Sequence, residues 1–152
     1  MTTGSYPPEI EARQQLTTGL LRWLLSLESP DVWTQRQLTV QPLATGQVRY
    51  QLIESSEDGV HREADLLADG VAEAVRTLQQ YMYSPTGGAW VTAELVVTAE
   101  GQGDAQFNYD AEPQIPGPDG APGGMSDEDV AAHLQTFPRP SVATPRWMQR
   151  QS

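Results

Sequence analysis

The sequence predicts an α+β fold in which helices pack on one face of an antiparallel four-stranded sheet. Two stretches, residues 32–54 and 89–110, each contain two runs of alternating apolar and polar residues, and this pattern is typical of β-hairpins. Three other stretches carry apolar residues at spacings of three and four, which indicates amphipathic helices. The expected order is α-β-β-α-β-β-α, within a single domain that covers residues 1–152.

The first helix is expected to begin at Pro7 and Pro8 and to end before Pro30. Proline in a first turn fixes a helical φ, and Glu9 and Glu11 beside it favour the positive end of the helix dipole. Its leucines form one broad apolar stripe: Leu16, Leu20, Leu21, Leu24, Leu25 and Leu27. This stripe predicts a helix that packs against other elements along one side.

Residues 32–41 and 48–54 predict the first hairpin. Alternation in its first strand places Arg36 on the same side as the apolar residues and Trp33 on a mostly polar outer side. An acidic turn, residues 55–59, follows the second strand.

The second helix is predicted over residues 64–83, and residues 84–88 end it. Its stripe consists of Leu67, Val71, Val75, Leu78 and Met82. The central hairpin then covers residues 89–110, with a reversal at residues 100–104, where two glycines can adopt a positive φ. Alternation places Trp90 on the side of this hairpin opposite the apolar one, so an exposed contact residue is one interpretation of Trp90.

The proline- and glycine-rich residues 111–124 show no periodicity and predict a mobile surface loop. Ser126, followed by three acids, is a helix N-cap signature. The short third helix that it begins has the stripe Val130, Leu134 and Phe137. The tail, residues 138–152, is expected to be extended by its prolines, with Trp147 and Met148 as an apolar plug that docks back onto the domain.

The charge balance is strongly acidic, with 9 basic and 20 acidic residues and a formal net charge of -11. Such a field opposes the phosphate backbone, so nucleic acid is not an expected partner. A basic protein is a more natural partner, although an acidic surface can also serve solubility alone. The chain contains no cysteine, so disulfides are not expected. It has no long apolar run and no signal-peptide pattern, so no membrane contact is expected and a cytoplasmic location is predicted.

Catalytic signatures are missing from the sequence. A serine triad would need one of the two histidines, but His61 is expected in an acidic loop and His133 lies one step off its helix stripe, so both are predicted to be surface residues. No zinc, EF-hand or phosphate-loop motif is present. Asp110 and Glu112 could form an acid–base pair, but acids two apart at a strand end are typical of a solvated edge. No catalytic residue, metal site or cofactor is expected.

Several short motifs of the chain resemble those of the YezG-like immunity proteins of bacterial polymorphic toxin systems, in particular their actinobacterial branch. The motifs are MYSPTGGAW at residues 82–90, ELVV at 94–97, FNYD at 107–110 with Glu112-Pro113, FPR at 137–139 and PRWM at 145–148. The chain departs from the family pattern in its long loop at residues 114–124 and at Arg146, where members often carry an acid. The resemblance implies a non-catalytic α+β protein that binds and neutralises a cognate toxin.

The first hypothesis is therefore an immunity protein that occludes a basic toxin. Aromatic side chains supply burial and an acid can pair with a basic residue of the partner. The candidate contact residues are Trp33, Tyr83, Trp90, Asn108, Tyr109 and Asp110. The alternative for Trp90 and Tyr109 is that they pack beneath the proline-rich loop of residues 111–124.

Two other function classes remain open from the sequence. A small-ligand-binding or regulatory module would need a concave pocket between the sheet and the loop of residues 111–124. An enzyme that uses Asp110 and Glu112 would need perturbed carboxylates in a cleft.

Overall fold

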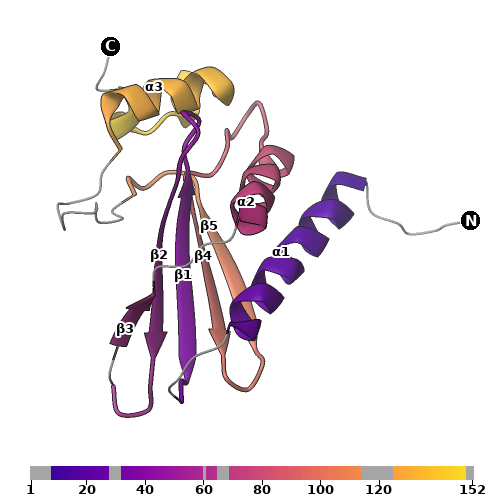
Figure 1. The fold of residues 1–152 in the computed structure, drawn as a ribbon. Coiled ribbons are helices and arrows are strands. Elements are labelled where there is room, and N and C mark those ends of the chain that lie inside the picture. The colour runs from indigo at the N-terminus through magenta and orange to yellow at the C-terminus, as the bar shows by residue number, and fades with distance from the viewer. Residues whose placement is uncertain (1–7, 28–31, 60, 65–68, 114–124, 150–152) are drawn as a thin grey trace, which may run out of the picture.

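The computed structural model describes residues 8–27, 32–59, 61–64, 69–113 and 125–149, and it confirms the α+β prediction and the order of the predicted elements (Figure 1). The elements are α1 (Pro8–Ser26), β1 (Gln35–Pro42), β2 (Val48–Ser55), β3 (His61–Ala64), α2 (Asp69–Met82), β4 (Thr92–Thr98), β5 (Gly103–Asn108), α3 (Asp127–Thr136) and two short 3-10 helices, η1 (Ser141–Ala143) and η2 (Arg146–Gln149). The expected loop over residues 114–124 lies outside the described residues.

The two predicted hairpins join into one antiparallel sheet with the strand order β3-β2-β1-β4-β5. In the middle of the sheet, Leu38 of β1 stands opposite both Leu52 of β2 and Leu95 of β4. The long strands therefore place their apolar residues in register across the sheet. This register produces a continuous apolar face.

The fifth strand, β3, is an addition to the predicted sheet. The sequence interpretation placed His61 in a loop and began the second helix at residue 64, and both are wrong: residues 61–64 pair with β2, and α2 begins at Asp69. The free edge of β2 offers unpaired backbone N–H and C=O groups. Pairing with that edge outweighs the local helix preference of these residues, since Arg62, Glu63 and Ala64 are all good helix formers.

The helices α1 and α2 cover one face of the sheet and pack against each other (Figure 1). The main core lies in this layer and includes Leu24 of α1, Leu78 of α2 and Leu95 of β4, each 1% exposed or less. Arg36 faces the same layer, as its alternation predicted, and is 1% exposed.

The third helix departs from this arrangement because α3 lies beyond one end of the sheet (Figure 1). There it packs in a second cluster with Leu43, Val91, Met125 and Met148. The Ser126 side chain accepts a hydrogen bond from the Asp129 backbone N–H, which confirms the predicted N-cap.

The docking of the tail is also confirmed, since Met148 is 1% exposed and belongs to the second cluster. The tail is not extended throughout, because the described part forms η1 and η2.

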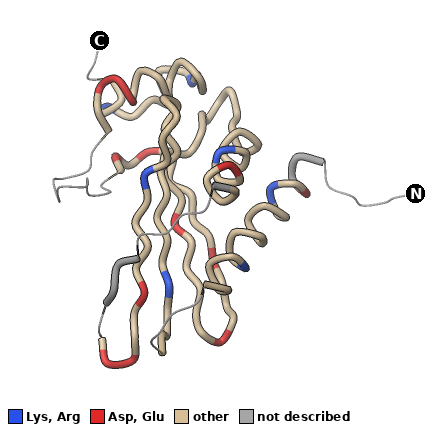
Figure 2. The backbone as a smooth tube through the Cα atoms, in the orientation of Figure 1, with Lys and Arg blue, Asp and Glu red and all other residues tan. Residues whose placement is uncertain are grey.

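Acidic residues gather at the turns and at the start of α3, as Figure 2 shows for the β2–β3 turn, the β4–β5 turn and residues 127–129. No helix of the described chain is long and apolar enough to cross a membrane.

Candidate functional site

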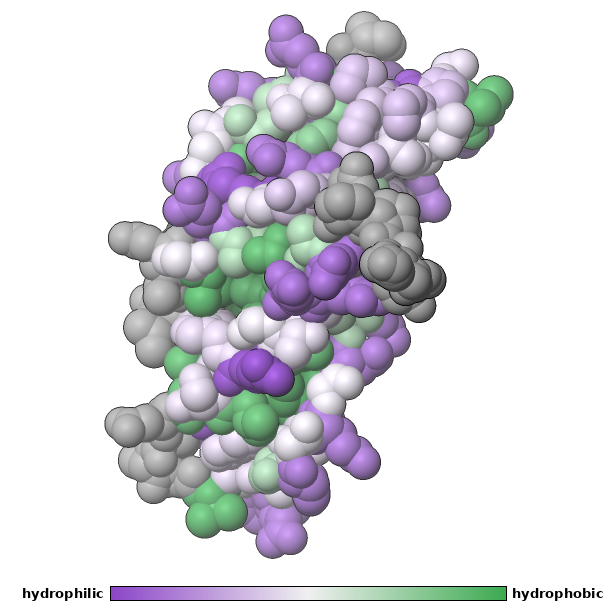
Figure 3. Space-filling model, turned by 90° about the vertical axis from the view of Figure 1, so that its right-hand side faces the viewer, coloured by the Kyte–Doolittle hydropathy of each residue, from purple (hydrophilic) through white to green (hydrophobic). Residues whose placement is uncertain are grey.

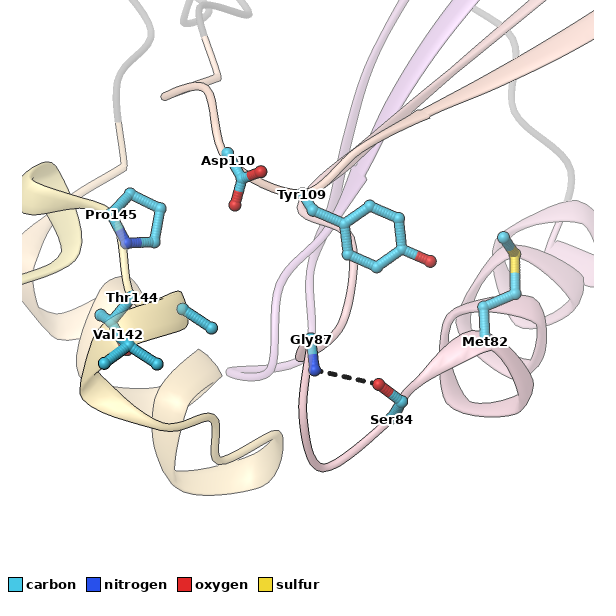
Figure 4. Close-up of a pocket in the computed structure, with 9 residues that line it drawn as sticks. Met82, Ser84, Gly87, Tyr109, Asp110, Val142, Thr144 and Pro145 are labelled. Carbon is cyan, nitrogen blue, oxygen red and sulfur yellow. Dashed lines mark hydrogen bonds between the residues drawn. The ribbon is translucent and has the colours of Figure 1, made fainter.

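A cleft of about 650 Å³ opens at the end of the sheet where β5 stops (Figure 4). Its lining residues are Met82, Ser84, Gly87, Tyr109, Asp110, Val142, Ala143, Thr144 and Pro145. They come from the end of α2, the α2–β4 connection, the residues after β5, and the tail. In Figure 4 the Tyr109 ring extends toward Met82, and Val142, Thr144 and Pro145 form the opposite wall. The cleft is thus built by three segments far apart in the sequence.

The wall formed by the α2–β4 connection is a tight, self-bonded turn. The backbone groups of Ser84 and Gly88 bond to each other in both directions at 3.2 and 2.8 Å, and the Ser84 hydroxyl accepts from the Gly87 N–H at 3.0 Å. Gly88 has a φ of +82°, and a Cβ at this position would clash with the Arg139 guanidinium. Glycine is required here for both its conformation and its size.

Asn108 shapes the chain as it leaves β5. Its side-chain oxygen accepts from the backbone N–H groups of Asp110 and Ala111, at 3.3 and 2.9 Å. Its amide nitrogen donates to the Thr92 hydroxyl at 3.1 Å and to the Ala111 carbonyl at 2.7 Å. Because both polar atoms of the side chain are used in this way, Asn108 positions Tyr109 and Asp110, and its contact with a partner stays a prediction.

Arg139 holds the base of the cleft together. Its guanidinium is completely buried and donates to three backbone carbonyls: Tyr109, Ala143 and Ala89, at 3.0 to 3.3 Å. Its Nη1 also lies 3.5 Å from the Asp110 carboxylate, whose side chain remains 80% exposed. Burial lowers the pKa of Arg139 while Asp110 and Tyr109 raise it, and arginine keeps its proton at neutral pH. The cleft therefore has a buried cation beneath an exposed anion.

The tail is fixed to the end of β5 and to α2. The Trp147 indole N–H donates to the Asp110 carbonyl at 2.7 Å. Tyr83 donates from its hydroxyl to the Pro138 carbonyl at 2.5 Å, and its ring packs on Phe137 with the centroids 5.5 Å apart. Tyr83, a predicted contact residue, thus links α2 to the tail beside the cleft.

Tyr109 and Asp110 are the two predicted contact residues that the structure places in the cleft. Tyr109 is partly buried against the main core. Burial raises the pKa of its hydroxyl, and the positive charges of Arg13 and Arg139 partly offset this effect. The Asp110 carboxylate faces solvent at the rim.

The predicted exposure of Trp90 is wrong. Trp90 is 0% exposed and packs in the main core, with its ring 5.5 Å from that of Phe107. The predicted alternation fails here because β4 begins only at Thr92, and the chain bends at Val91. Trp90 therefore turns toward the helices, while Val91 enters the second cluster.

Trp33 lies apart from the cleft, just before the opposite end of β1. The Arg36 guanidinium lies over its ring, with 3.9 Å between the guanidinium carbon and the ring centroid. The neighbouring Thr34 bonds to Ser55 and Ala99, which are at the far ends of β2 and β4 from the cleft. Trp33 and the cleft cannot belong to one small contact site.

His133 is also a correction, because it is buried and not a surface residue. It is 2% exposed, and its ring lies 5.5 Å from that of Phe137. Burial lowers its pKa from 6.5 to about 4, the charge of Arg139 acts in the same direction, and a hydrogen bond with the backbone of Ala89 opposes them. The side chain of His61 lies outside the described part of the structure.

Arg139 and the tail wall of Val142 to Pro145 are the parts of the site that the sequence interpretation missed. An arginine between two prolines was a local signal for Arg139, since prolines restrict the backbone around it. Among the described residues no group of three histidine, cysteine or acidic side chains is placed to hold a metal ion.

Searches against protein-family models and against curated proteins found no match to this chain.

Proposed function

We propose that this chain is an immunity protein, which binds a cognate bacterial toxin domain and neutralises it by stoichiometric occlusion in the cytoplasm of the producing cell. The observation that carries the proposal is the cleft at the end of β5, where the half-buried ring of Tyr109 lies beside the exposed carboxylate of Asp110. An aromatic surface next to a charge that a partner can desolvate is the usual composition of a binding hot spot.

Electrostatics favours a basic partner. The chain has a net charge of -11, and a field of this sign speeds the encounter with a positively charged surface. At the rim, the Asp110 carboxylate is 80% exposed and can accept hydrogen bonds from an arginine or lysine of the toxin.

The polar groups of the cleft favour binding over catalysis. The Asp110 carboxylate lies 3.5 Å from the buried Arg139, and Asn108 uses both its oxygen and its nitrogen within the fold. Groups that are held in this way provide a rigid, preorganised surface, and preorganisation reduces the entropic cost of association.

The first experiment is capture of the partner from a lysate of the host with the tagged protein, followed by mass spectrometry. A basic toxin recovered close to one-to-one, whose activity the protein blocks, is the expected result. Absence of any stoichiometric partner contradicts the proposal.

A pair of valines provides a matched test of the cleft. Val142 lines the cleft and is 95% exposed, whereas Val32 is 86% exposed near the opposite end of the sheet. Neither side chain supports the core, so Val142→Asp and Val32→Asp should both fold. Val142→Asp is expected to lose capture of the toxin and Val32→Asp to retain it. Equal capture by the two variants rules out the cleft as the contact surface.

A small-ligand-binding module is the second candidate, and the cleft volume of about 650 Å³ favours it. Ligand pockets commonly have volumes of roughly 300–1,000 Å³. The cleft faces the tail and the α2–β4 connection, so this candidate no longer depends on the loop of residues 111–124. A thermal-shift screen with small metabolites separates the two candidates, because a resident ligand raises the melting temperature without any partner protein.

A further inference from the structure

A second hollow adjoins the cleft on the side of α1. It has a volume of about 420 Å³, and its lining consists of Arg13, Gln14, Thr17, Thr18, Met82 and Phe107. Met82 also lines the cleft. The two hollows therefore meet at the end of α2.

Tyr109 lies in the cleft beside the shared residue Met82. Its ring extends from the end of β5 toward Met82 (Figure 4), and the charges of Arg13 and Arg139 both act on its hydroxyl. Phe107, two residues earlier on the same side of β5, lines the second hollow. The two hollows, with Met82 between them, thus follow a line from α1 past Tyr109 to the tail, and we refer to them together as the groove.

The two ends of this groove carry opposite charges. At the α1 end, Arg13 has no acidic partner among the described residues. At the tail end, the Asp110 carboxylate is 80% exposed. Between them the lining mixes apolar side chains, such as Met82 and Phe107, with polar ones, such as Thr17 and Ser84. On the side of the molecule that carries α1, apolar groups form small patches separated by polar ones (Figure 3), so binding there must combine both kinds of contact.

We infer that this groove binds a single extended segment of the partner protein, with a basic side chain at Asp110, an acidic side chain at Arg13 and an apolar side chain over Met82. The inference rests on the proposed function and specifies the chemistry of the toxin segment. Opposite charges at the two ends fix the direction of the segment, because the reversed segment would place like charges together.

The arrangement of two neighbouring hollows is compatible with a segment of polypeptide. The two hollows have volumes of about 650 and 420 Å³ and share Met82 as a lining residue. An extended chain advances about 3.3 Å per residue and can place alternate side chains in successive hollows.

The test uses a phage-displayed library of random peptides of about 12 residues, which reach roughly 40 Å when extended. Peptides selected on the full-length protein are expected to carry a basic and an acidic residue at a fixed spacing around an apolar one. Asp110→Asn should remove the preference for the basic residue. Arg13→Glu should replace the preference for the acidic residue by a basic one.

Two matched variants control for net charge. Arg22 is exposed on the same helix as Arg13, and Asp104 is exposed on β5. Arg22→Glu and Asp104→Asn should select the same peptides as the unaltered protein, and circular dichroism establishes that all four variants are folded. Binding of the selected peptides should weaken about tenfold in Asp110→Asn, equivalent to 1.4 kcal/mol.

Selection of no peptide, of peptides without paired charges, or of the same peptides by all variants overturns the inference. Its failure is distinguishable from failure of the proposed function. A toxin that is captured equally well by Arg13→Glu and Asp110→Asn refutes only the groove, whereas absence of a captured toxin refutes the immunity function.

Discussion

Two buried arginines, Arg36 and Arg139, lie at opposite ends of the sheet, and their carboxylate partners differ in solvent exposure. Arg36 donates from Nη1 to the carbonyls of Leu24 and Leu25, at 2.9 and 3.1 Å, and thereby caps the last turn of α1. Arg139 instead joins the carbonyls of three separate segments at the base of the cleft.

The carboxylates make the difference between these two ends. Glu54 lies 3.0 Å from Arg36 and its side chain is 8% exposed, so this ion pair is closed inside the fold. Asp110 lies 3.5 Å from Arg139 and its side chain is 80% exposed. A closed pair can contribute only to the structure, whereas an open carboxylate on a fixed base is available to a partner.

The largest expected effect is on the closed pair. Arg36→Met removes the Arg36 cation from the buried Glu54 carboxylate, and breaking a buried ion pair in this way costs about 3–5 kcal/mol. Urea denaturation should show this decrease in the free energy of unfolding, while Arg22→Met at an exposed position of α1 should change it by less than about 0.5 kcal/mol. Equal effects of the two variants would mean that the closed pair is not structural.

Acid should weaken the cleft end through His133. Its folded pKa of about 4 lies below the ordinary value of 6.5, so between these values the unfolded chain binds the proton more strongly. The contribution of neutral His133 to the free energy of unfolding is fully present above pH 6.5. It decreases as the pH falls, and the total loss is roughly 3 kcal/mol below pH 4.

The measurement is the free energy of unfolding between about pH 7.5 and pH 4 for the unaltered protein and for His133→Gln. Carboxylates titrate in both proteins, so the difference between the two curves isolates the histidine. Parallel curves would show that His133 has no part in the acid sensitivity.

A smaller effect is expected at the turn beneath Arg139. Gly88→Ala and Gly101→Ala both place a Cβ at positive φ, which costs about 1–2 kcal/mol. Only at Gly88 does the new Cβ meet a side chain, that of Arg139, since nothing lies within 4 Å at Gly101. Gly88→Ala should therefore lower the melting temperature more than Gly101→Ala does. A larger decrease in Gly101→Ala would contradict the close approach of Arg139.

The smallest effect on stability is expected at the open carboxylate. Asp110→Asn should change the free energy of unfolding by no more than about 1 kcal/mol, because exposed ion pairs contribute little. The same variant should weaken toxin binding about tenfold. If Asp110→Asn lowered the free energy of unfolding as much as Arg36→Met does, the open pair would be as structural as the closed pair.

Sequence periodicity alone was sufficient for most of the fold. Alternation along β1 and β4 predicted which side of each strand faces the helices, including the inward Arg36, because side chains on a strand must alternate. The sequence also predicted the N-cap at Ser126 and the docking of Met148, since each depends on a local signal.

Only the tertiary structure decided where Trp90, His133 and the strand β3 belong. Trp90 turns inward because the chain bends before β4 begins, and residues 61–64 become a strand because the edge of β2 is there to pair with them. The cleft itself depends on Arg139 reaching the carbonyls of residues 30 and 50 positions away. Local patterns cannot predict such contacts, because they form only when the tail packs against the end of the sheet.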